Sequence, residues 1–254
     1  MAILDKEVFA VSKDSSEVEV YDLDLIKLNF SRQWSLDELI DPRDIGSCNL
    51  DKCLYISNSN EILRVAPNGK LIKKWSTGDD IGFGLSITDE PIVISAVFRE
   101  NKLNEYSPDG RLLREINLSS DARSPLHAIK LTNGHFVVSL DSFHRSDYPR
   151  VCTVDENGKL HKTFDGEFGS TTGDLDNPFY LSVDGNGFVM VADLNMRRVL
   201  LLDSELKFVR EILSKDKHKL QGPSRILLDE SNRRLIVADN NIVNRNANIL
   251  IFNL

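Results

Sequence analysis

The sequence contains few of the residues that mark secreted, metal-stabilised or redox proteins. Its 254 residues include only 3 cysteines, which form neither an even disulfide framework nor a CxxC pair. Four residues separate Cys48 from Cys53, and no second pair or histidine cluster completes a zinc site. We therefore interpret Cys48, Cys53 and Cys152 as reduced thiols of an intracellular protein, and we predict no metal and no cofactor.

Long hydrophobic runs are also missing. No apolar stretch approaches the roughly 20 residues that a membrane-spanning helix needs, and the amino terminus reaches a charged residue at Asp5 before a signal-peptide core can form. These absences predict a cytoplasmic protein without a membrane partner.

Catalytic signatures are absent from the sequence as well. The 5 histidines form no HExxH motif, and there is no GxSxG elbow and no glycine-rich phosphate loop. The stretch from Asp184 to Gly187 begins like a calcium loop, but it lacks the later acidic ligands, which favours a tight hairpin turn. We predict no catalytic residue and no small-molecule substrate.

Positive charge is outnumbered by negative charge. The net charge of −8 argues mildly against a nucleic-acid-binding protein, since phosphate binding needs a basic surface. With 28% charged and 41% hydrophobic residues, the chain is not disordered and can bury a sizeable core.

What the sequence does contain is an internal repeat. Pro178–Leu194 and Pro223–Asn240 each begin with proline and continue through a short apolar run that ends in aspartate. A turn follows, and then a second run that ends in Val-Ala-Asp. Weaker copies recur upstream about every 45 residues, each with a β-rich run, a second strand and, in four copies, a turn such as Pro67-Asn-Gly69 followed by a further strand.

Four strands in each of six repeats predict an all-β, six-bladed β-propeller with antiparallel blades. We expect one domain over 1–254, with blades at about 1–40, 41–79, 80–121, 122–170, 171–217 and 218–254. Helical periodicity is weak, and Leu36–Asp41 forms at most one turn. The last copy ends at its third strand, so we expect 23 of 24 strands, with the outer strand of the last blade missing.

The repeat resembles the NHL repeat. The pattern of proline, an apolar run, Val-Ala-Asp and Arg-Val is clearest at 178–203, good at 223–251 and degenerate in the first four copies. The family commonly has asparagine three residues after the aspartate, whereas Met196 stands there and Arg198 still matches the family arginine. The resemblance implies the propeller found at the carboxyl end of tripartite-motif and related ubiquitin-ligase proteins. Ligase chemistry itself would need RING and B-box domains, whose cysteines this sequence lacks.

Four repeat residues, Pro178, Asp193, Pro223 and Asp239, are interpreted as structural. A short carboxylate at a strand exit accepts hydrogen bonds from backbone N–H groups of a loop, and matched positions in two blades indicate architecture rather than catalysis. Trp34 and Trp75 end two strands in similar contexts, and we expect them to pack between neighbouring blades.

The loops that link second to third strands offer the best candidate binding face, because arginine and aromatic residues are favoured at binding hot spots. The candidate residues for contacting a partner are Phe98, Arg99, Phe143, His144, Arg145, Tyr148, Arg197, Arg198 and Arg245.

Three functions are compatible with this pattern. The first is a non-catalytic scaffold that binds a protein partner, as the substrate-recruiting domain of a tripartite-motif-type ubiquitin ligase would. The second is sequence-selective binding of single-stranded RNA by a basic propeller face. The third, less favoured, is a metal-dependent propeller hydrolase or lactonase, which would gather polar ligands at the central channel.

Overall fold

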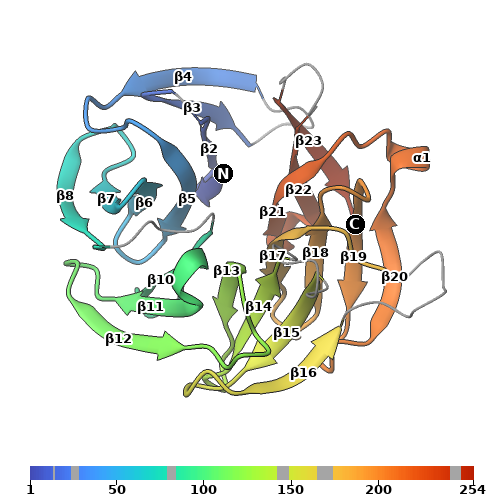
Figure 1. The fold of residues 1–254 in the computed structure, drawn as a ribbon. Helices are drawn as coiled ribbons and strands as arrows, with labels where there is room; N and C mark the ends of the chain where they lie inside the picture. Colours follow the sequence, from blue (N-terminus) through green and yellow to red (C-terminus); the bar gives the residue numbers. More distant parts are fainter. Residues whose placement is uncertain (14, 24–28, 79–83, 142–148, 165–173, 241–246) are drawn as a thin grey trace. The chain divides into compact units, whose positions relative to one another are not determined.

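The computed structural model describes residues 1–13, 15–23, 29–78, 84–141, 149–164, 174–240 and 247–254. Over these residues the chain is an all-β, six-bladed propeller, built from five four-stranded antiparallel sheets and one three-stranded sheet (Figure 1). Both the predicted fold class and the missing outer strand of the last blade are confirmed. The chain divides into two compact units, Met1–Ile116 and Asn117–Leu254.

The first unit holds three sheets, with strand orders β1-β2-β3-β4, β5-β6-β7-β8 and β12-β11-β10-β9. Their strands are β1 (Ala2–Leu4), β2 (Glu7–Val11), β3 (Glu17–Asp22), β4 (Asn29–Ser35), β5 (Pro42–Cys48), β6 (Cys53–Asn58), β7 (Glu61–Val65), β8 (Leu71–Ser76), β9 (Leu85–Ile87), β10 (Val93–Val97), β11 (Lys102–Tyr106) and β12 (Leu112–Asn117). A short 3₁₀ helix, η1 (Phe98–Glu100), follows β10.

The second unit holds the other three sheets, with strand orders β13-β14-β15-β16, β17-β18-β19-β20 and β21-β22-β23. Their strands are β13 (Pro125–Lys130), β14 (Phe136–Leu140), β15 (Arg150–Val154), β16 (Leu160–Phe164), β17 (Pro178–Val183), β18 (Val189–Asp193), β19 (Arg198–Leu202), β20 (Phe208–Leu213), β21 (Pro223–Asp229), β22 (Arg234–Asn240) and β23 (Ala247–Asn253). A second 3₁₀ helix, η2 (Glu230–Asn232), links β21 to β22.

One α-helix, α1 (Lys215–His218), occurs among the described residues. The sequence pattern missed it, because four residues are too few to show helical periodicity. Ser214 caps its start through a side chain that accepts from the backbone N–H of Lys217. The stretch Leu36–Asp41, where we expected at most one helical turn, holds a turn without a helix. None of the helices described here is long and apolar enough to cross a membrane.

Within a blade, burial falls from the second strand to the fourth. All five residues of β18 are buried, whereas β20 is mostly exposed. Strands covered on both faces read as continuous apolar runs, which explains the Val-Met-Val-Ala-Asp sequence of β18. Full burial of each valine or methionine contributes roughly 1.5–3 kcal/mol. Second strands such as β18, together with third strands such as β11 and β19, therefore hold most of the buried side chains of the blades.

The turn between the third and fourth strands repeats with the same hydrogen bonds. In blade four, the backbone N–H of Asp155 donates a hydrogen bond to the carbonyl of Lys159, and the N–H of Gly158 donates to the carbonyl of Asp155. Gly158 has a φ of 78°, and an added Cβ would lie 2.0 Å from the carbonyl oxygen of Asn117. In blade five the same turn places Leu206 at φ 58°. The predicted Asn-Gly and Asp-Gly turns are therefore present, and blade five builds the turn without glycine.

The two tryptophans pack between neighbouring blades, as predicted. A Cβ added to Gly69 would lie 2.8 Å from the Trp34 ring, and one added to Gly110 would lie 2.5 Å from the Trp75 ring. Trp75 also meets the ring of Tyr55 edge-on, with 6.2 Å between ring centroids. The outer strand of each of these blades thus places an indole against the glycine turn of the next one.

Candidate interaction surface

Blade five holds its loop between the second and third strands with a buried ion pair. The Asp193 carboxylate lies 3.1 Å from Nε of Arg198, and these side chains are 0% and 3% exposed. Asp193 also accepts the backbone N–H of Asp176 at 3.1 Å, and Arg198 donates to the carbonyl of Asp174. Two buried anchors therefore clamp the ends of the four-residue loop 194–197.

The burial of Asp193 perturbs its proton affinity. Removal from water raises the pKa of this carboxyl to about 6, although Arg198 and the bond from Asp176 act in the opposite direction. Desolvation outweighs the ion pair here. Burial therefore disfavours the ionised form of this structural carboxyl group.

Arg198 was predicted to lie on the partner-binding face, and this assignment is corrected by its burial. The guanidinium is turned into the blade by Asp193 and is 3% exposed, so it offers no donor to a partner. The spacing of the motif places an arginine after the loop, but spacing alone does not show which way that side chain points.

The exposed residues of this loop are its central ones. Asn195 is exposed, Met196 is 40% exposed and Arg197 is half-buried. Arg197 has a φ of 56°, a left-handed conformation that non-glycine residues adopt rarely. The clamp thus holds Asn195 and Met196 outward in one defined shape. Met196 had been noted only as a departure from the family pattern.

In the first unit, the corresponding loop of blade three forms η1. Phe98 is half-buried and Arg99 is exposed, while Asn101 closes the loop at a φ of 52°. Two predicted interface residues are therefore presented by a short, defined segment. The other five, Phe143, His144, Arg145, Tyr148 and Arg245, lie outside the described residues.

Asp239 and Asp193 sit opposite the first prolines of their sheets, since Pro178 pairs with Asp193 and Pro223 with Asp239. Asp239 accepts the backbone N–H groups of Gln221 at 2.9 Å and Gly222 at 2.8 Å. The predicted use of these carboxylates as loop acceptors is confirmed. The Asp184–Gly187 stretch likewise forms a hairpin turn, in which the Asp184 carboxylate accepts from Asn186 at 3.0 Å.

Blade two performs the same task with an amide that sequence reasoning missed. Asn58 pairs with Pro42, and its side-chain oxygen accepts the N–H groups of Ile40 and Asp41, each at 2.9 Å. Its amide nitrogen donates to the carbonyl of Glu38 at 2.8 Å. The available signal was Asn58 at the end of an apolar run, 16 residues after Pro42.

A further repeated position was also missed in the sequence. Two residues after the first proline of four blades, at a β-bulge, stand Asp44, His127, Tyr180 and Arg225. In the second unit, His127 stacks on Tyr180 with ring centroids 3.8 Å apart, and the Arg225 guanidinium lies 4.8 Å from the same ring. All three are buried. This row joins the first strands of three successive blades by stacking and cation–π contact.

In the first unit, Asp44 occupies the same position and joins blades by hydrogen bonds. It is 1% exposed, and its carboxylate accepts the backbone N–H of Leu85, from the next blade, at 2.9 Å. The amino terminus of Met1 lies 4.0 Å away. Chemically different side chains thus make the same link between inner strands.

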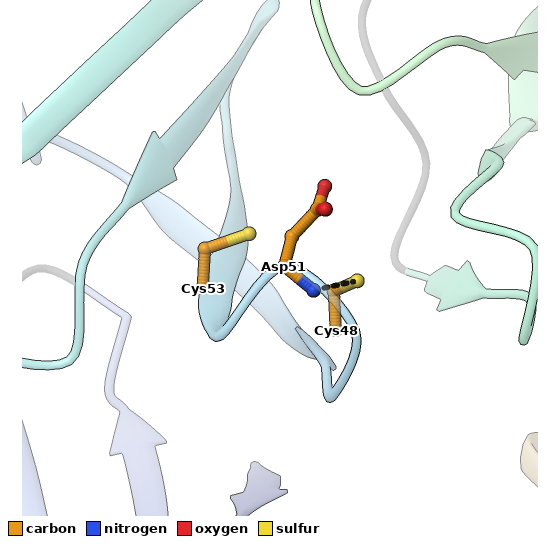
Figure 2. A group of neighbouring side chains, drawn as sticks. All are labelled: Cys48, Asp51 and Cys53. Carbon is orange, nitrogen blue, oxygen red and sulfur yellow. Dashed lines mark hydrogen bonds between the residues drawn. The ribbon is translucent and has the colours of Figure 1, made fainter.

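The turn between β5 and β6 gathers two thiols and a carboxylate (Figure 2). The ligand atoms of Cys48, Asp51 and Cys53 all lie within 4.8 Å of one another. Arg64 donates to the Cys53 sulfur at 3.4 Å and to Asp51 at 2.9 Å. Burial raises the pKa of the Cys53 thiol in spite of Arg64. All three cysteines are buried thiols.

No family model matches the sequence, and no curated protein does either. Solved structures do match. A protein of unknown function from Bacteroides caccae has a TM-score of 0.71 and 14% identity over 91% of this chain and 81% of that one. Kuenenia stuttgartiensis hydrazine synthase has a TM-score of 0.67 and 13% identity over 99% of this chain and 95% of that one.

A third match is virginiamycin B lyase from Staphylococcus aureus, with a TM-score of 0.60 and 12% identity over 98% of this chain and 82% of that one. At this level of identity the likeness establishes the fold alone. The propeller is thereby supported from outside the sequence, while the NHL resemblance stays a prediction.

Proposed function

We propose that this protein is a non-catalytic interaction scaffold in the cytoplasm whose loops between second and third strands bind a protein partner. In the larger context that the NHL resemblance implies, it would recruit the substrate of a tripartite-motif-type ubiquitin ligase. The observation that carries the proposal is the clamped loop of blade five, which buries its charged ends and exposes its centre.

The energetic argument concerns pre-organisation. Ordering a loop on binding costs conformational entropy, and a loop that is already held in its bound shape avoids much of that cost. The Asp193–Arg198 pair and the left-handed Arg197 hold the 194–197 loop before any partner arrives. Methionine is adaptable and polarisable, which suits contact with a protein surface, and Met196 is the exposed apolar residue of this loop.

The η1 loop of blade three supplies a second contact of similar kind. Arg99 is exposed and follows the half-buried Phe98 in the sequence, and arginine and aromatic residues are favoured at binding hot spots. The two loops belong to different units, and each is proposed separately as a contact site.

RNA binding is the alternative that the experiment must separate. It needs exposed guanidinium groups to contact phosphates, and the Arg198 group predicted for this purpose is neutralised inside the blade by Asp193. This observation favours a protein partner over a nucleic acid.

The test places a photo-reactive amino acid at position 99 or 196 of the purified chain, which is then irradiated in cytoplasmic extract. Matched controls carry it at Asn68 or Asn157, exposed turn positions of other blades. We expect a discrete protein adduct at 99 or 196 that is absent at both controls. An excess of the unlabelled, unmodified chain should abolish the adduct by competing for the partner, whereas unlabelled Met196→Asp or Arg99→Glu should fail to compete and leave the adduct in place. Adducts removed by ribonuclease would favour RNA, and equal adducts at all four positions would overturn the proposal.

A further inference from the structure

The hairpin of β5 and β6 places two cysteines directly opposite each other. Cys48 is the last residue of β5, Cys53 is the first of β6, and they are register partners. Side chains of directly opposed residues point to the same face of an antiparallel pair. The turn therefore brings two sulfurs together without help from the rest of the chain.

The third polar group comes from the turn itself. Asp51 donates its backbone N–H to the Cys48 sulfur at 3.3 Å, which ties the turn to the first cysteine. A carboxylate oxygen of Asp51 and the two sulfurs all lie within 4.8 Å of one another. Figure 2 shows the three side chains at this turn. Zinc–sulfur bonds of about 2.3 Å in a tetrahedron place two sulfurs about 3.8 Å apart, so ligation needs the group to contract by at most roughly an ångström.

From this geometry we propose that Cys48, Asp51 and Cys53 bind a thiophilic divalent cation of the zinc class. Thiolates select soft and borderline metals rather than calcium or magnesium. The proposal is independent of the interaction function argued above. From the sequence we expected no zinc site, because no second cysteine pair and no histidine cluster accompany Cys48 and Cys53; that expectation left the turn carboxylate out of account.

Charge supports this assignment. Arg64 lies within hydrogen-bond distance of both Asp51 and Cys53, so the metal-free site, with two thiols, has a carboxylate balanced by a guanidinium. A divalent cation that displaces the two thiol protons adds two positive and two negative charges. The site is electrically neutral in both states, so binding leaves no uncompensated charge against the buried sulfurs.

Access and coordination number are also suitable. Cys48 and Cys53 are 3% and 0% exposed, while Asp51 and Lys52 at the turn are exposed. A cation can therefore enter through the turn and meet the carboxylate first. Three protein ligands leave a fourth tetrahedral position for water or for a side chain of a partner.

The experiment titrates the whole reduced chain with Zn²⁺ against a chromophoric chelator, and with Cd²⁺ or Co²⁺ to detect metal–thiolate absorption bands. We expect one equivalent to bind with a thiolate band. Asp51→Asn should weaken binding at least about tenfold and Cys48→Ser about a hundredfold, since even outer-shell changes cost 10–100-fold in metal affinity.

The controls are Cys152→Ser, which removes a buried thiol from another blade, and Asp216→Asn, which removes an exposed carboxylate. Both should bind metal as the unmodified chain does. Asp51 is an exposed turn residue, so Asp51→Asn keeps the test valid if a cysteine variant does not fold. Binding unchanged by Asp51→Asn and Cys48→Ser, absence of a thiolate band, or a Cys48–Cys53 disulfide that persists under mild reduction would overturn the proposal.

Discussion

Blades five and six carry the two best copies of the repeat, yet they satisfy the same aspartate differently. In blade five the residue opposite Asp193 is Arg198, and in blade six the residue opposite Asp239 is Asn248. Asp193 is bound by a buried guanidinium, whereas Asp239 accepts two backbone N–H groups within 3.0 Å. Both aspartates hold the loop that precedes the first strand of their blade, and in blade five Asp193 forms an ion pair as well.

The buried Asp193–Arg198 ion pair of blade five carries a desolvation cost that has no counterpart at Asn248 in blade six. A buried ion pair must offset the loss of hydration of both charges, and the raised pKa of Asp193 shows that desolvation outweighs its partners. The free energy of unfolding should therefore respond to these two aspartates by different amounts, which four predictions test in decreasing order of effect.

The largest effect is expected from Arg198→Ala. It leaves the Asp193 carboxylate buried without its guanidinium, which costs about 3–5 kcal/mol. Asn248→Ala, the change at the equivalent and exposed position of blade six, should change stability by less than about 0.5 kcal/mol. Urea unfolding of the whole chain measures both, and similar losses in the two variants would contradict this account.

The next effect concerns pH. Because the pKa of Asp193 is raised to about 6 in the folded chain, from an ordinary value of about 3.9, the folded state holds its proton more tightly. The stabilisation of the folded chain by this bound proton is complete below about pH 4. It decreases as the pH rises through about 6, by roughly 2–3 kcal/mol in total.

Unfolding of the unmodified chain, Asp193→Asn and Asn248→Ala should be compared at several pH values between 4 and 7. The stability difference between the unmodified chain and Asp193→Asn should change across this interval, whereas that for Asn248→Ala should stay constant, because neither asparagine nor alanine titrates. A constant difference for Asp193→Asn would show that this carboxyl titrates normally.

A smaller loss is expected for Asp239→Asn at neutral pH. Asn58 already fills the equivalent position of blade two, where its side-chain oxygen accepts two backbone N–H groups at 2.9 Å. An amide can therefore replace the carboxylate of Asp239 at a cost of less than about 1 kcal/mol, within the range of one net hydrogen bond. A loss as large as that of Arg198→Ala in urea unfolding would show that the charge of Asp239 matters.

The smallest expected effect on stability concerns the outer edge strands of blades five and six. The outer strand of blade five, β20, contains Arg210 and Glu211, whereas β23 contains no charged residue and pairs only with β22 among the described strands. Charged residues protect exposed edges from pairing with other chains. Asn248→Lys should slow aggregation, followed by light scattering, and change stability by less than about 0.5 kcal/mol. Asn157→Lys, at a turn, is the control and should leave the aggregation rate unchanged.

Much of the fold could be predicted because its signals are local. The Val-Ala-Asp runs, the Asn-Gly turns and the opening prolines each depend on a few neighbouring residues, and their recurrence predicts strand number and order. The missed features are those without a local pattern. Asn58 replaces the aspartate of the motif, and α1 is too short to show a period.

The candidate site was less predictable, since a repeat pattern states where a residue stands but not what surrounds it. Arg198 and Arg197 are adjacent in the sequence, yet one is buried against Asp193 and the other is half-buried in the loop. Phe98 and Arg99 were recognised correctly as loop residues, while Met196 was treated only as a departure from a consensus.

By itself, the sequence determined six repeats, their strands and turns, and a last blade with one strand fewer, because spacing and alternation along the chain encode these features. Tertiary structure decided which polar residues are buried inside the blades and which remain exposed to solvent. The partners of Arg198, of the His127–Tyr180 stack and of the Cys48–Cys53 pair come from other strands or from a turn carboxylate. Burial and contact across strands are properties of the folded chain, and no local spacing specifies them.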